Sequence, residues 1–234
     1  MMPPIAVLAG GLATRLRPLT ETIPKAMIPV KGEPFAHHLL RLLARNGFEE
    51  AVFLIGYKGE DIINSIGNGK KFGINVRYVA DGPQLLGTGG ALSRASPSLS
   101  DTFAVVYGDS WLDFDYQSAF RAFEEDGRPA LMTIFRNHGK WDTSNVEYNG
   151  QEIIAYSKNN RTPQMSYIDY GFSILKSEVF AEAPADRPFD LSEIFEALAR
   201  NGQLAGYEVT RRFYEVGSFT GIADLEAHLA GDLS

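Results

Sequence analysis

Cysteine is absent from the 234 residues of this sequence, and its absence excludes several classes of protein. Without thiols there is no disulfide scaffold, no cysteine-ligated zinc site, no thiol nucleophile and no redox motif. Long apolar runs are also missing, since none approaches the roughly 18 residues that suggest a membrane-spanning helix. The opening residues Met-Met-Pro-Pro-Ile lack the positive charge that begins a signal peptide. We therefore expect a cytoplasmic protein that does not act at a membrane.

Positive charge is in the minority, with 22 Lys and Arg against 29 Asp and Glu and a formal net charge of −7. General nucleic-acid binding is therefore not expected, and any affinity for phosphate must come from a local cluster of cations. There is no internal repeat of about 20 to 50 residues, which excludes solenoids and propellers. With 44% hydrophobic and 22% charged residues, the composition is that of a globular protein with a substantial core.

Four apolar, β-branched runs predict the strands of an α/β fold. They are Ile5 to Leu8, Ala51 to Ile55, Val76 to Val79 and Phe103 to Val106. Their spacing leaves room for a helix between each pair, and a helix before Asn46-Gly47 has one apolar face, formed by Phe35, Leu39, Leu42 and Leu43. Continuous hydrophobicity in the runs predicts a mostly parallel sheet covered on both faces, which binds ligands beyond the carboxyl ends of its strands.

The second half of the chain changes in character from about Asn145. Residues 146–148 and 153–156, separated by Asn149-Gly150, predict an inserted β-hairpin with a type I′ turn. Asp190 and Glu193 have capping-box spacing and predict the start of a helix. A last helix follows Gly217-Ser218, at about 218–230.

A glycine pair and three cations follow the first predicted strand. Gly10 and Gly11 allow backbone N–H groups to approach a phosphate, and Arg15, Arg17 and Lys25 supply positive charge. The segment is neither a Walker A loop nor a GxGxxG motif. From these residues alone, a plain tight turn and a solvated basic face remain alternatives.

The segment AGGLATRLRPLTETIPKAMIPV nevertheless resembles the signature of the sugar-1-phosphate nucleotidylyltransferases, also called nucleotide-sugar pyrophosphorylases. Three further motifs, Tyr107-Gly108-Asp109, Tyr156-Ser157-Lys158 and Tyr214-Glu215-Val216-Gly217, follow in the family's order. The resemblance thus covers nearly the whole chain. It is strongest to compact bacterial mannose- or heptose-1-phosphate guanylyltransferases and muramate-phosphate uridylyltransferases.

The resemblance implies a Rossmann-like three-layer α/β/α nucleotidyltransferase fold with a mostly parallel mixed sheet and a hairpin insertion that binds sugar. We expect one catalytic domain over residues 1–234, without an appended β-helix. Its nucleotide-binding part would be about 1–110, its sugar-binding part about 111–215, and a helix at about 218–230 would close it. The family transfers a nucleoside monophosphate from an NTP to a sugar 1-phosphate and releases pyrophosphate, and it is commonly oligomeric.

Residue roles follow from the same resemblance. Arg15, Lys25 and Asp109 would be catalytic, with Arg15 on the β and γ phosphates and Lys25 between the α-phosphate and the sugar phosphate. The nucleotide-binding residues would be Ala9, Gly10, Gly11, Thr14, Arg15, Gln84, Gly87, Thr88 and Gly108. The residues that bind the sugar phosphate would be Lys25, Asn145, Glu147, Lys158, Asp169 and Gly171.

The resemblance also implies Mg²⁺, held by Asp109 and by a second carboxylate near the C-terminus. That second ligand is usually Asp, and here the position is Glu215, whose extra methylene leaves both direct and water-bridged binding open. Without the other motifs, Asp109 could equally be a turn or N-cap residue. The polar residues assigned to the sugar could equally satisfy local backbone groups.

Two other functions compete with this hypothesis. The nucleotide part could serve a cytidylyltransferase for phosphocholine or another phosphate monoester, because Trp111 and Trp141 leave an aromatic cage open. The chain could also be a catalytically silent relative that regulates a partner. Intact Arg15, Lys25 and Asp109 argue against a silent protein.

Overall fold

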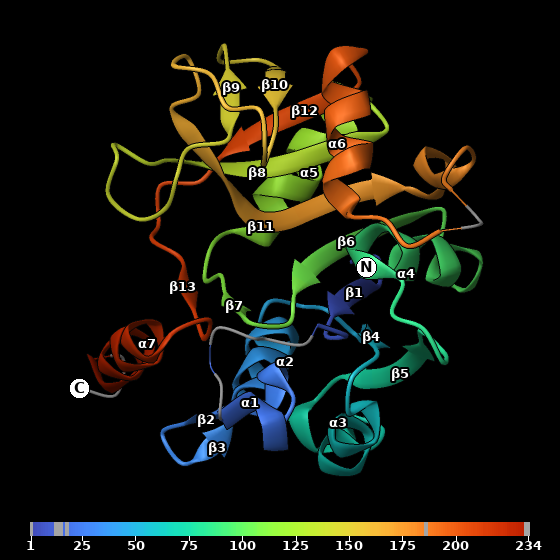
Figure 1. Cartoon of the computed structure of the whole chain (residues 1–234), viewed down its shortest axis with the longest axis vertical. Coiled ribbons are helices and arrows are strands. Elements are labelled where there is room, and N and C mark those ends of the chain that lie inside the picture. The colour runs from blue at the N-terminus through green and yellow to red at the C-terminus, as the bar shows by residue number, and fades with distance from the viewer. Residues whose placement is uncertain (1, 12–15, 17–18, 185–186, 232–234) are drawn as a thin grey trace. The chain divides into compact units, whose positions relative to one another are not determined.

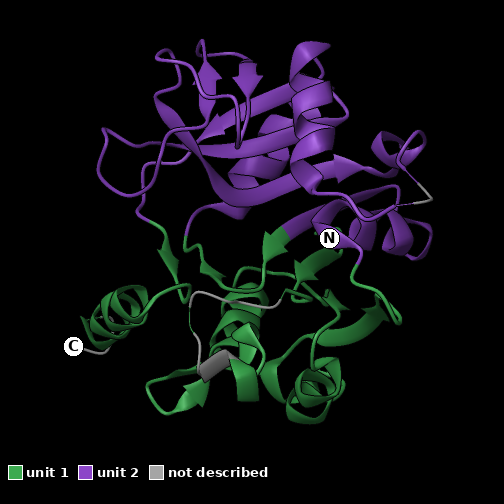
Figure 2. Cartoon of the chain, in the orientation of Figure 1, with its two compact units in different colours: residues 1–85, 106–113, 213–234 green, residues 86–105, 114–212 purple. Residues whose placement is uncertain are grey.

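The computed structural model describes residues 2–11, 16, 19–184 and 187–231. The chain divides into two compact units (Figure 2). Unit 1 contains residues 1–85, 106–113 and 213–234, and unit 2 contains residues 86–105 and 114–212. Within the described ranges, no helix is long and apolar enough to cross a membrane.

The sheet of unit 1 is parallel, in the order β1, β4, β5 (Figure 1). The register pairs Ile5 with Ala51 and Glu50 with Asn75. The elements of this unit are β1 Ile5–Leu8, α1 Leu19–Thr22, η2 Lys25–Met27, β2 Pro29–Val30, β3 Glu33–Pro34, α2 Phe35–Arg45, β4 Glu50–Ile55, α3 Gly59–Ile66, η3 Lys70–Phe72, β5 Asn75–Ala80, β7 Ser110–Trp111, β13 Tyr214–Glu215 and α7 Phe219–Gly231.

Helix α2 forms where the apolar stripe predicts it. Phe35, Leu39 and Leu43 are buried. The helix ends at Arg45 with Asn46 as its C-cap, and Gly47 takes a φ of +89°, a conformation in which a side chain would be strained. The continuous apolar runs of β1 and β4 are likewise buried, as a covered parallel sheet requires.

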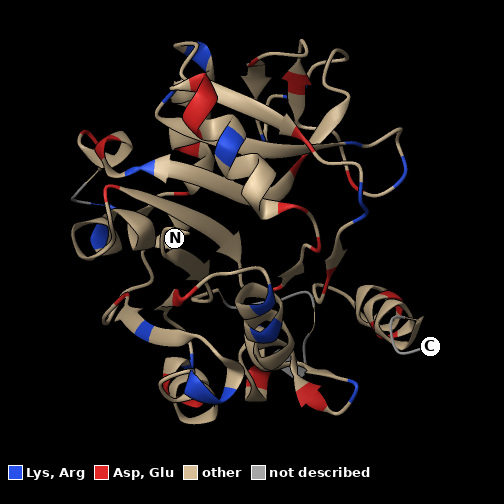
Figure 3. Ribbon diagram, turned by 180° about the vertical axis from the view of Figure 1, so that it is seen from behind, with Lys and Arg blue, Asp and Glu red and all other residues tan. Residues whose placement is uncertain are grey.

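Unit 2 has a mixed sheet in which β8 pairs antiparallel with β11 and parallel with β12. Helix α6 lies in front of this sheet in Figure 1, and α5 lies on its other face, as Figure 3 shows from behind. The elements of this unit are α4 Gly87–Ala95, η4 Ser96–Ser98, α5 Tyr116–Asp126, β8 Ala130–Arg136, β9 Val146–Tyr148, β10 Ile153–Tyr156, β11 Tyr167–Lys176, η5 Ser177–Phe180, α6 Leu191–Arg200 and β12 Leu204–Glu208. Strand β6 Thr102–Tyr107 begins in unit 2 and ends in unit 1.

The predicted fold class is confirmed: a mixed, mostly parallel sheet with flanking helices, and a hairpin of β9 and β10 in the second half of the chain. The type I′ turn is wrong. Four residues connect Tyr148 to Ile153, and of the pair at the turn only Gly150 has a positive φ. Asn149 Oδ1 accepts from the N–H groups of Gln151 and Glu152, because an Asn side chain readily mimics a backbone turn.

Candidate active site

Gly10, the first glycine of the pair after β1, lies against Gly56, the residue that follows β4. A Cβ added to Gly10 would lie 3.2 Å from Gly56 N, and one added to Gly56 would lie 3.0 Å from Gly10 O. Gly10 and Gly56 therefore allow a close backbone approach, which agrees with a loop that exposes N–H groups to a ligand. Ala9 N donates to Leu54 O at 2.9 Å and fixes the start of the loop. Thr14 and Arg15, which the sequence places next, lie outside the described residues.

Asp81 is a residue near this loop that the sequence analysis missed. It is 5% exposed, and its Oδ2 lies 3.4 Å from the position of a Cβ on Gly10 and 3.1 Å from that of one on Gly56. Its backbone N donates to Ile55 O. The available signal was its position two residues after the predicted strand Val76 to Val79, near the end at which parallel sheets carry functional residues.

Gly108 joins the end of β6 to the end of β1. Its N–H donates to Leu8 O at 2.9 Å, and a Cβ at this position would lie 2.8 Å from the same oxygen. Only glycine permits this contact without a backbone shift. The close approach determines where the next residue, Asp109, leaves the sheet.

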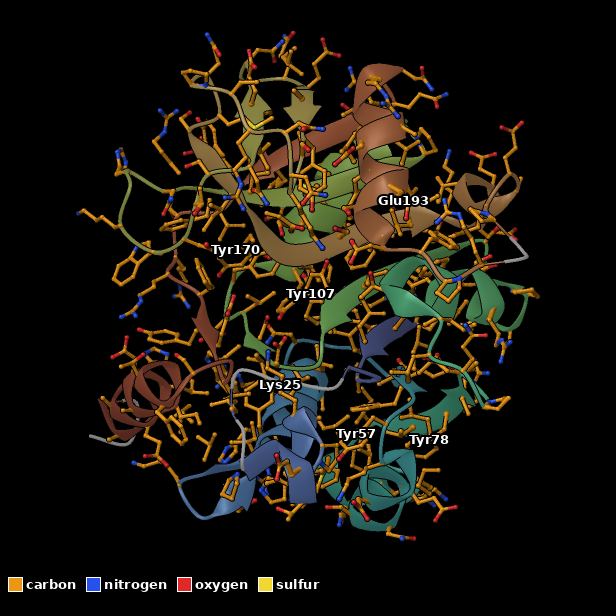
Figure 4. The ribbon with its side chains drawn as sticks, in the orientation of Figure 1. Lys25, Tyr57, Tyr78, Tyr107, Tyr170 and Glu193 are labelled. Atoms are coloured by element: carbon orange, nitrogen blue, oxygen red, sulfur yellow. The ribbon has the colours of Figure 1, made fainter. Side chains whose placement is uncertain are left out.

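Asp109 forms an ion pair with Lys25. Lys25, which is labelled in Figure 4, is the first residue of η2. Both side chains are mostly buried, at 21% and 28% exposed. The Ser110 hydroxyl lies 3.4 Å from the other carboxylate oxygen. Two of the residues predicted to be catalytic are therefore in direct contact.

Glu215 comes to the same place through a short antiparallel ladder. Strand β13 pairs with β7 so that Glu215 lies opposite Ser110, and Val216 N donates to Asp109 O at 2.9 Å. A Cβ on Gly217 would lie 3.3 Å from Lys25 Nζ and 3.4 Å from Glu215 Oε2. Asp109, Lys25 and Glu215 thus form one cluster in unit 1, which we call the carboxylate–lysine cluster.

Helix α7 packs against the backbone of this cluster. A Cβ on Gly221 would lie 2.3 Å from Glu215 O, so the helix approaches β13 more closely than any side chain allows. The Tyr214 ring stacks on His228 at 4.5 Å, and Lys31 N donates to Glu226 Oε1 at 2.7 Å. The closing helix therefore helps to fix the position of the Glu215 backbone.

In unit 2, the turn that carries the predicted nucleotide-binding residues Gly87 and Thr88 lies on the segment before α6. Gly87 has a φ of +73°, and a Cβ there would lie 2.4 Å from Phe189 O. Thr88 Oγ1 accepts from Leu191 N at 2.8 Å. Thr88 thus has a structural contact, and its role in nucleotide binding stays a prediction. Gln84, in unit 1, is exposed.

The predicted sugar-binding residues of unit 2 are linked to one another. Asp169 N donates to Asn145 Oδ1 at 3.0 Å, and Asp169 Oδ1 accepts from Gly171 N at 2.9 Å. The register of β11 shifts just after Asp169, where Gly171 takes a φ of +99°. Because Asn145 uses its oxygen in this way, its amide N–H groups are the part that can donate to a sugar hydroxyl.

Burial is the main reason why the pKa of Asp169 is raised, to about 6, although the Gly171 N–H and the nearby Lys158 oppose the shift. Lys158 Nζ donates to Asp190 Oδ1 at 2.8 Å. Asp190 also begins α6 in the predicted capping box with Glu193. Glu147 lies in β9 opposite Ala155.

Comparison with known proteins defines the family. A family model described as nucleotidyl transferase matches residues 5–231. The chain therefore belongs to the nucleotidyl transferase family, as the sequence motifs predicted. Of the three residues predicted to be catalytic, the structure describes Asp109 and Lys25.

Among curated relatives, the UTP–glucose-1-phosphate uridylyltransferase of Synechocystis is 30% identical and aligns with 88% of this chain and 58% of its own length. The mannose-1-phosphate guanylyltransferase of Mycobacterium tuberculosis is 28% identical, with 96% and 65% covered. The N-acetylmuramate alpha-1-phosphate uridylyltransferase of Neisseria meningitidis is 27% identical, with 96% and 97% covered. The chain thus spans less than two thirds of the first two relatives and nearly all of the third.

Solved structures show the same fold. HddC from Yersinia pseudotuberculosis superposes with a TM-score of 0.82 and 21% identity, covering 97% of this chain and 100% of that one. A putative glucose-1-phosphate thymidylyltransferase from Bacillus anthracis gives a TM-score of 0.82, with 97% and 95% covered. These matches support the Rossmann-like nucleotidyltransferase fold.

The aromatic cage that would suit phosphocholine is not favoured. The Arg212 guanidinium lies 3.9 Å from the centre of the Trp141 ring. Since this ring already carries a cation of the protein itself, it does not offer that face to a quaternary ammonium group. Each of the three relatives is itself named for a sugar 1-phosphate.

Proposed function

We propose that this protein transfers a nucleoside monophosphate from an NTP to a sugar 1-phosphate and releases pyrophosphate. The carboxylate–lysine cluster of unit 1 carries the proposal, because it combines a cation for phosphate with two carboxylates for a metal. Family membership and relatives named uridylyl- and guanylyltransferases support it. The proposed acceptor is a hexose or heptose 1-phosphate, with guanylyl or uridylyl transfer.

The chemistry explains why the cluster has no histidine. An oxygen of the sugar phosphate attacks the α-phosphorus, the bond from that phosphorus to the β-phosphate oxygen breaks, and pyrophosphate leaves. The attacking oxygen is already anionic, so no base has to remove a proton. Catalysis then depends on holding two anions close together and on neutralising their charge.

Lys25 has the central role in this proposal. Its ammonium group would neutralise charge on the α-phosphate and the incoming sugar phosphate, while Arg15 would bind the β and γ phosphates. Ala9, Gly10, Gly11 and Gly108 would bring backbone groups against the nucleotide. We propose that residues of about 1–110 bind the nucleotide and residues of about 111–215 bind the sugar phosphate.

Mg²⁺ fits the donors of the cluster. The described residues contain no group of three or more His, Cys, Asp or Glu side chains that would enclose a metal ion. Mg²⁺ commonly takes only one or two carboxylates, and substrate phosphates and water complete its shell. Asp109 and Glu215 would therefore hold it, and when bound it would neutralise charge on the NTP phosphates.

Pyrophosphate release tests the proposal directly. The assay would pair each of four NTPs with a panel of hexose and heptose 1-phosphates in the presence of Mg²⁺. We expect turnover with at least one pair, and none with phosphocholine. Nucleotide binding without turnover on any pair would instead identify a catalytically silent relative.

A further inference from the structure

Lys158 is held by helix α6, to which the sequence analysis gave no part in the site. Its Nζ donates to Asp190 Oδ1 at 2.8 Å, and the same oxygen accepts from Ser192 N at 2.9 Å. Asp190 is the N-cap of α6, so its position is fixed by the helix. Asp190 therefore fixes one of the three N–H groups of the ammonium in space.

A second contact from α6 fixes the turn that carries Lys158. The buried Ser157 donates its hydroxyl hydrogen to Glu196 Oε1 at 3.0 Å. The hydroxyl oxygen of Ser157 in turn accepts from the backbone N–H groups of Asn159 and Asn160, at 3.3 and 2.9 Å. Glu196 thus orients the hydroxyl whose lone pairs hold the backbone around Lys158.

The start of α6 is joined to the turn at residues 86–90. Phe189 N donates to Leu86 O at 3.0 Å, and Gly89 N donates to Phe189 O at 3.0 Å. Gly89 has no room for a Cβ, which would lie 2.3 Å from the Phe189 ring. The segment that carries Asp190 is therefore fixed by backbone contacts to the predicted nucleotide-binding turn, all within unit 2.

We propose that Asp190 and Glu196 are positioning residues that hold Lys158 ready for the phosphate of the sugar substrate. The inference rests on the proposed function, in which Lys158 binds that phosphate. A free lysine side chain loses much rotamer freedom when it binds an anion. Asp190 and Glu196 restrict the Lys158 side chain before the substrate binds. Two N–H groups of its ammonium are then left for phosphate oxygens.

The sign of the effect separates this role from simple electrostatics. Asp190 carries a negative charge close to the expected phosphate, so electrostatic repulsion alone predicts that removing it strengthens sugar-phosphate binding. Positioning predicts the opposite, because the loosened lysine must be ordered by the substrate. The KM for the sugar 1-phosphate therefore rises in one case and falls in the other.

The test compares variants of Asp190 and Glu196 in the pyrophosphate-release assay. Asp190→Ser keeps an N-cap residue but is too short for Lys158. We expect it and Glu196→Ala each to raise the KM for the sugar 1-phosphate about fivefold, with the KM for the NTP changed less than about twofold. Glu196→Gln should stay near the wild type, because its amide oxygen still accepts from Ser157.

Glu193→Gln is the matched control. Glu193 lies on the same helix (Figure 4) and forms the other half of the capping box, but it does not contact Lys158. Its KM values should match the wild type. A Lys158→Met background completes the comparison: Asp190→Ser should raise KM no further there, because Asp190 acts through the lysine.

An unchanged or lower KM for the sugar 1-phosphate in Asp190→Ser would overturn the inference. So would an equal rise of both KM values in Glu193→Gln and Asp190→Ser, since that pattern reports a damaged helix. A wild-type protein without turnover on any substrate pair would instead refute the proposed function, and the inference with it. An active wild type with unaffected variants refutes the inference alone.

Discussion

The two units hold their candidate site residues in different ways. In unit 1, backbone hydrogen bonds and glycines without room for a side chain bring Asp109, Glu215 and Lys25 together. In unit 2, side chains make the contacts, since Lys158 donates to the Asp190 carboxylate and the Asn145 side chain accepts from the backbone N–H of Asp169. A site that is positioned by backbone contacts tolerates little movement of the chain. A site that is positioned by side-chain contacts can change through single substitutions that leave the backbone in place. We expect the residues of unit 1 to carry out the proposed reaction and the residues of unit 2 to determine the specificity for the sugar.

The difference does not come from the overall distribution of charge. In the view from behind, basic and acidic residues are interspersed on the described parts of both units (Figure 3). The charged groups that matter are local pairs, such as Lys25 with Asp109 and Lys158 with Asp190. In a chain with a net charge of −7, any affinity for anions would therefore depend on individual cations such as Lys25 and Lys158 and not on a general positive field.

The largest expected effect comes from Asp109→Asn. The variant loses the charge that pairs with Lys25 and that would hold Mg²⁺, so turnover should fall roughly a thousandfold. Because the pair is partly exposed, the melting temperature should change by no more than about 2 °C. Pyrophosphate release and thermal unfolding measure both quantities. Normal metal-dependent turnover in this variant would contradict the assignment of unit 1 as the reacting centre.

Glu215→Gln should act mainly on the requirement for metal. Losing one of the two proposed carboxylates should raise the Mg²⁺ concentration for half-maximal turnover about tenfold. Glu215→Asp keeps the charge and should have the smaller effect. Titration of turnover with Mg²⁺ checks the order of the three proteins. If the Glu215→Gln variant and the wild type need the same Mg²⁺ concentration for half-maximal turnover, Glu215 does not take part in metal binding.

Gly221→Ala tests whether backbone position controls unit 1. The new Cβ would lie 2.3 Å from Glu215 O, so β13 must shift. We expect about 1 to 3 kcal/mol lower stability, the usual cost of overpacking, and about tenfold slower turnover. Gly231→Ala, in the same helix with nothing within 4 Å of the new Cβ, should change the free energy of unfolding by no more than about 0.5 kcal/mol. Equal effects of the two substitutions would mean that the close approach has no role.

Asp169 should affect the pH dependence of stability. Its pKa is raised to about 6 in the folded protein, mainly by burial, so the unfolded chain releases this proton at lower pH. Its contribution to stability is therefore greatest below the unfolded pKa and is lost as pH rises to about 6. Asp169→Asn, whose amide oxygen still accepts from Gly171 N, should be about 1 to 3 kcal/mol more stable than the wild type at pH 7.

Urea unfolding at several pH values between 4 and 7.5 measures this difference. The two proteins should converge at the acidic end of the range. A constant difference across the range would show that Asp169 does not titrate there, and that its role in unit 2 is only to accept hydrogen bonds.

Much of this molecule can be predicted from local sequence. Apolar runs predicted β1, β4, β5 and β6, and the stripe from Phe35 to Leu43 predicted α2, because burial on a sheet or helix face imposes a period that the residues reveal. The capping box at Asp190 and the hairpin were also predicted. The hairpin turn was predicted wrongly, since Asn-Gly is compatible with more than one loop length and the strand register decides between them.

The sequence by itself determined the fold class, the family motifs and the candidate residues, because each depends on short segments with their own chemical pattern. Only the tertiary structure decided which candidates touch. The β7–β13 ladder brings Glu215 to Asp109, and the path of α6 brings Asp190 and Glu196 to the turn of Lys158. Contacts between residues distant in sequence depend on strand register and helix packing, and no local pattern in one sequence encodes those distances.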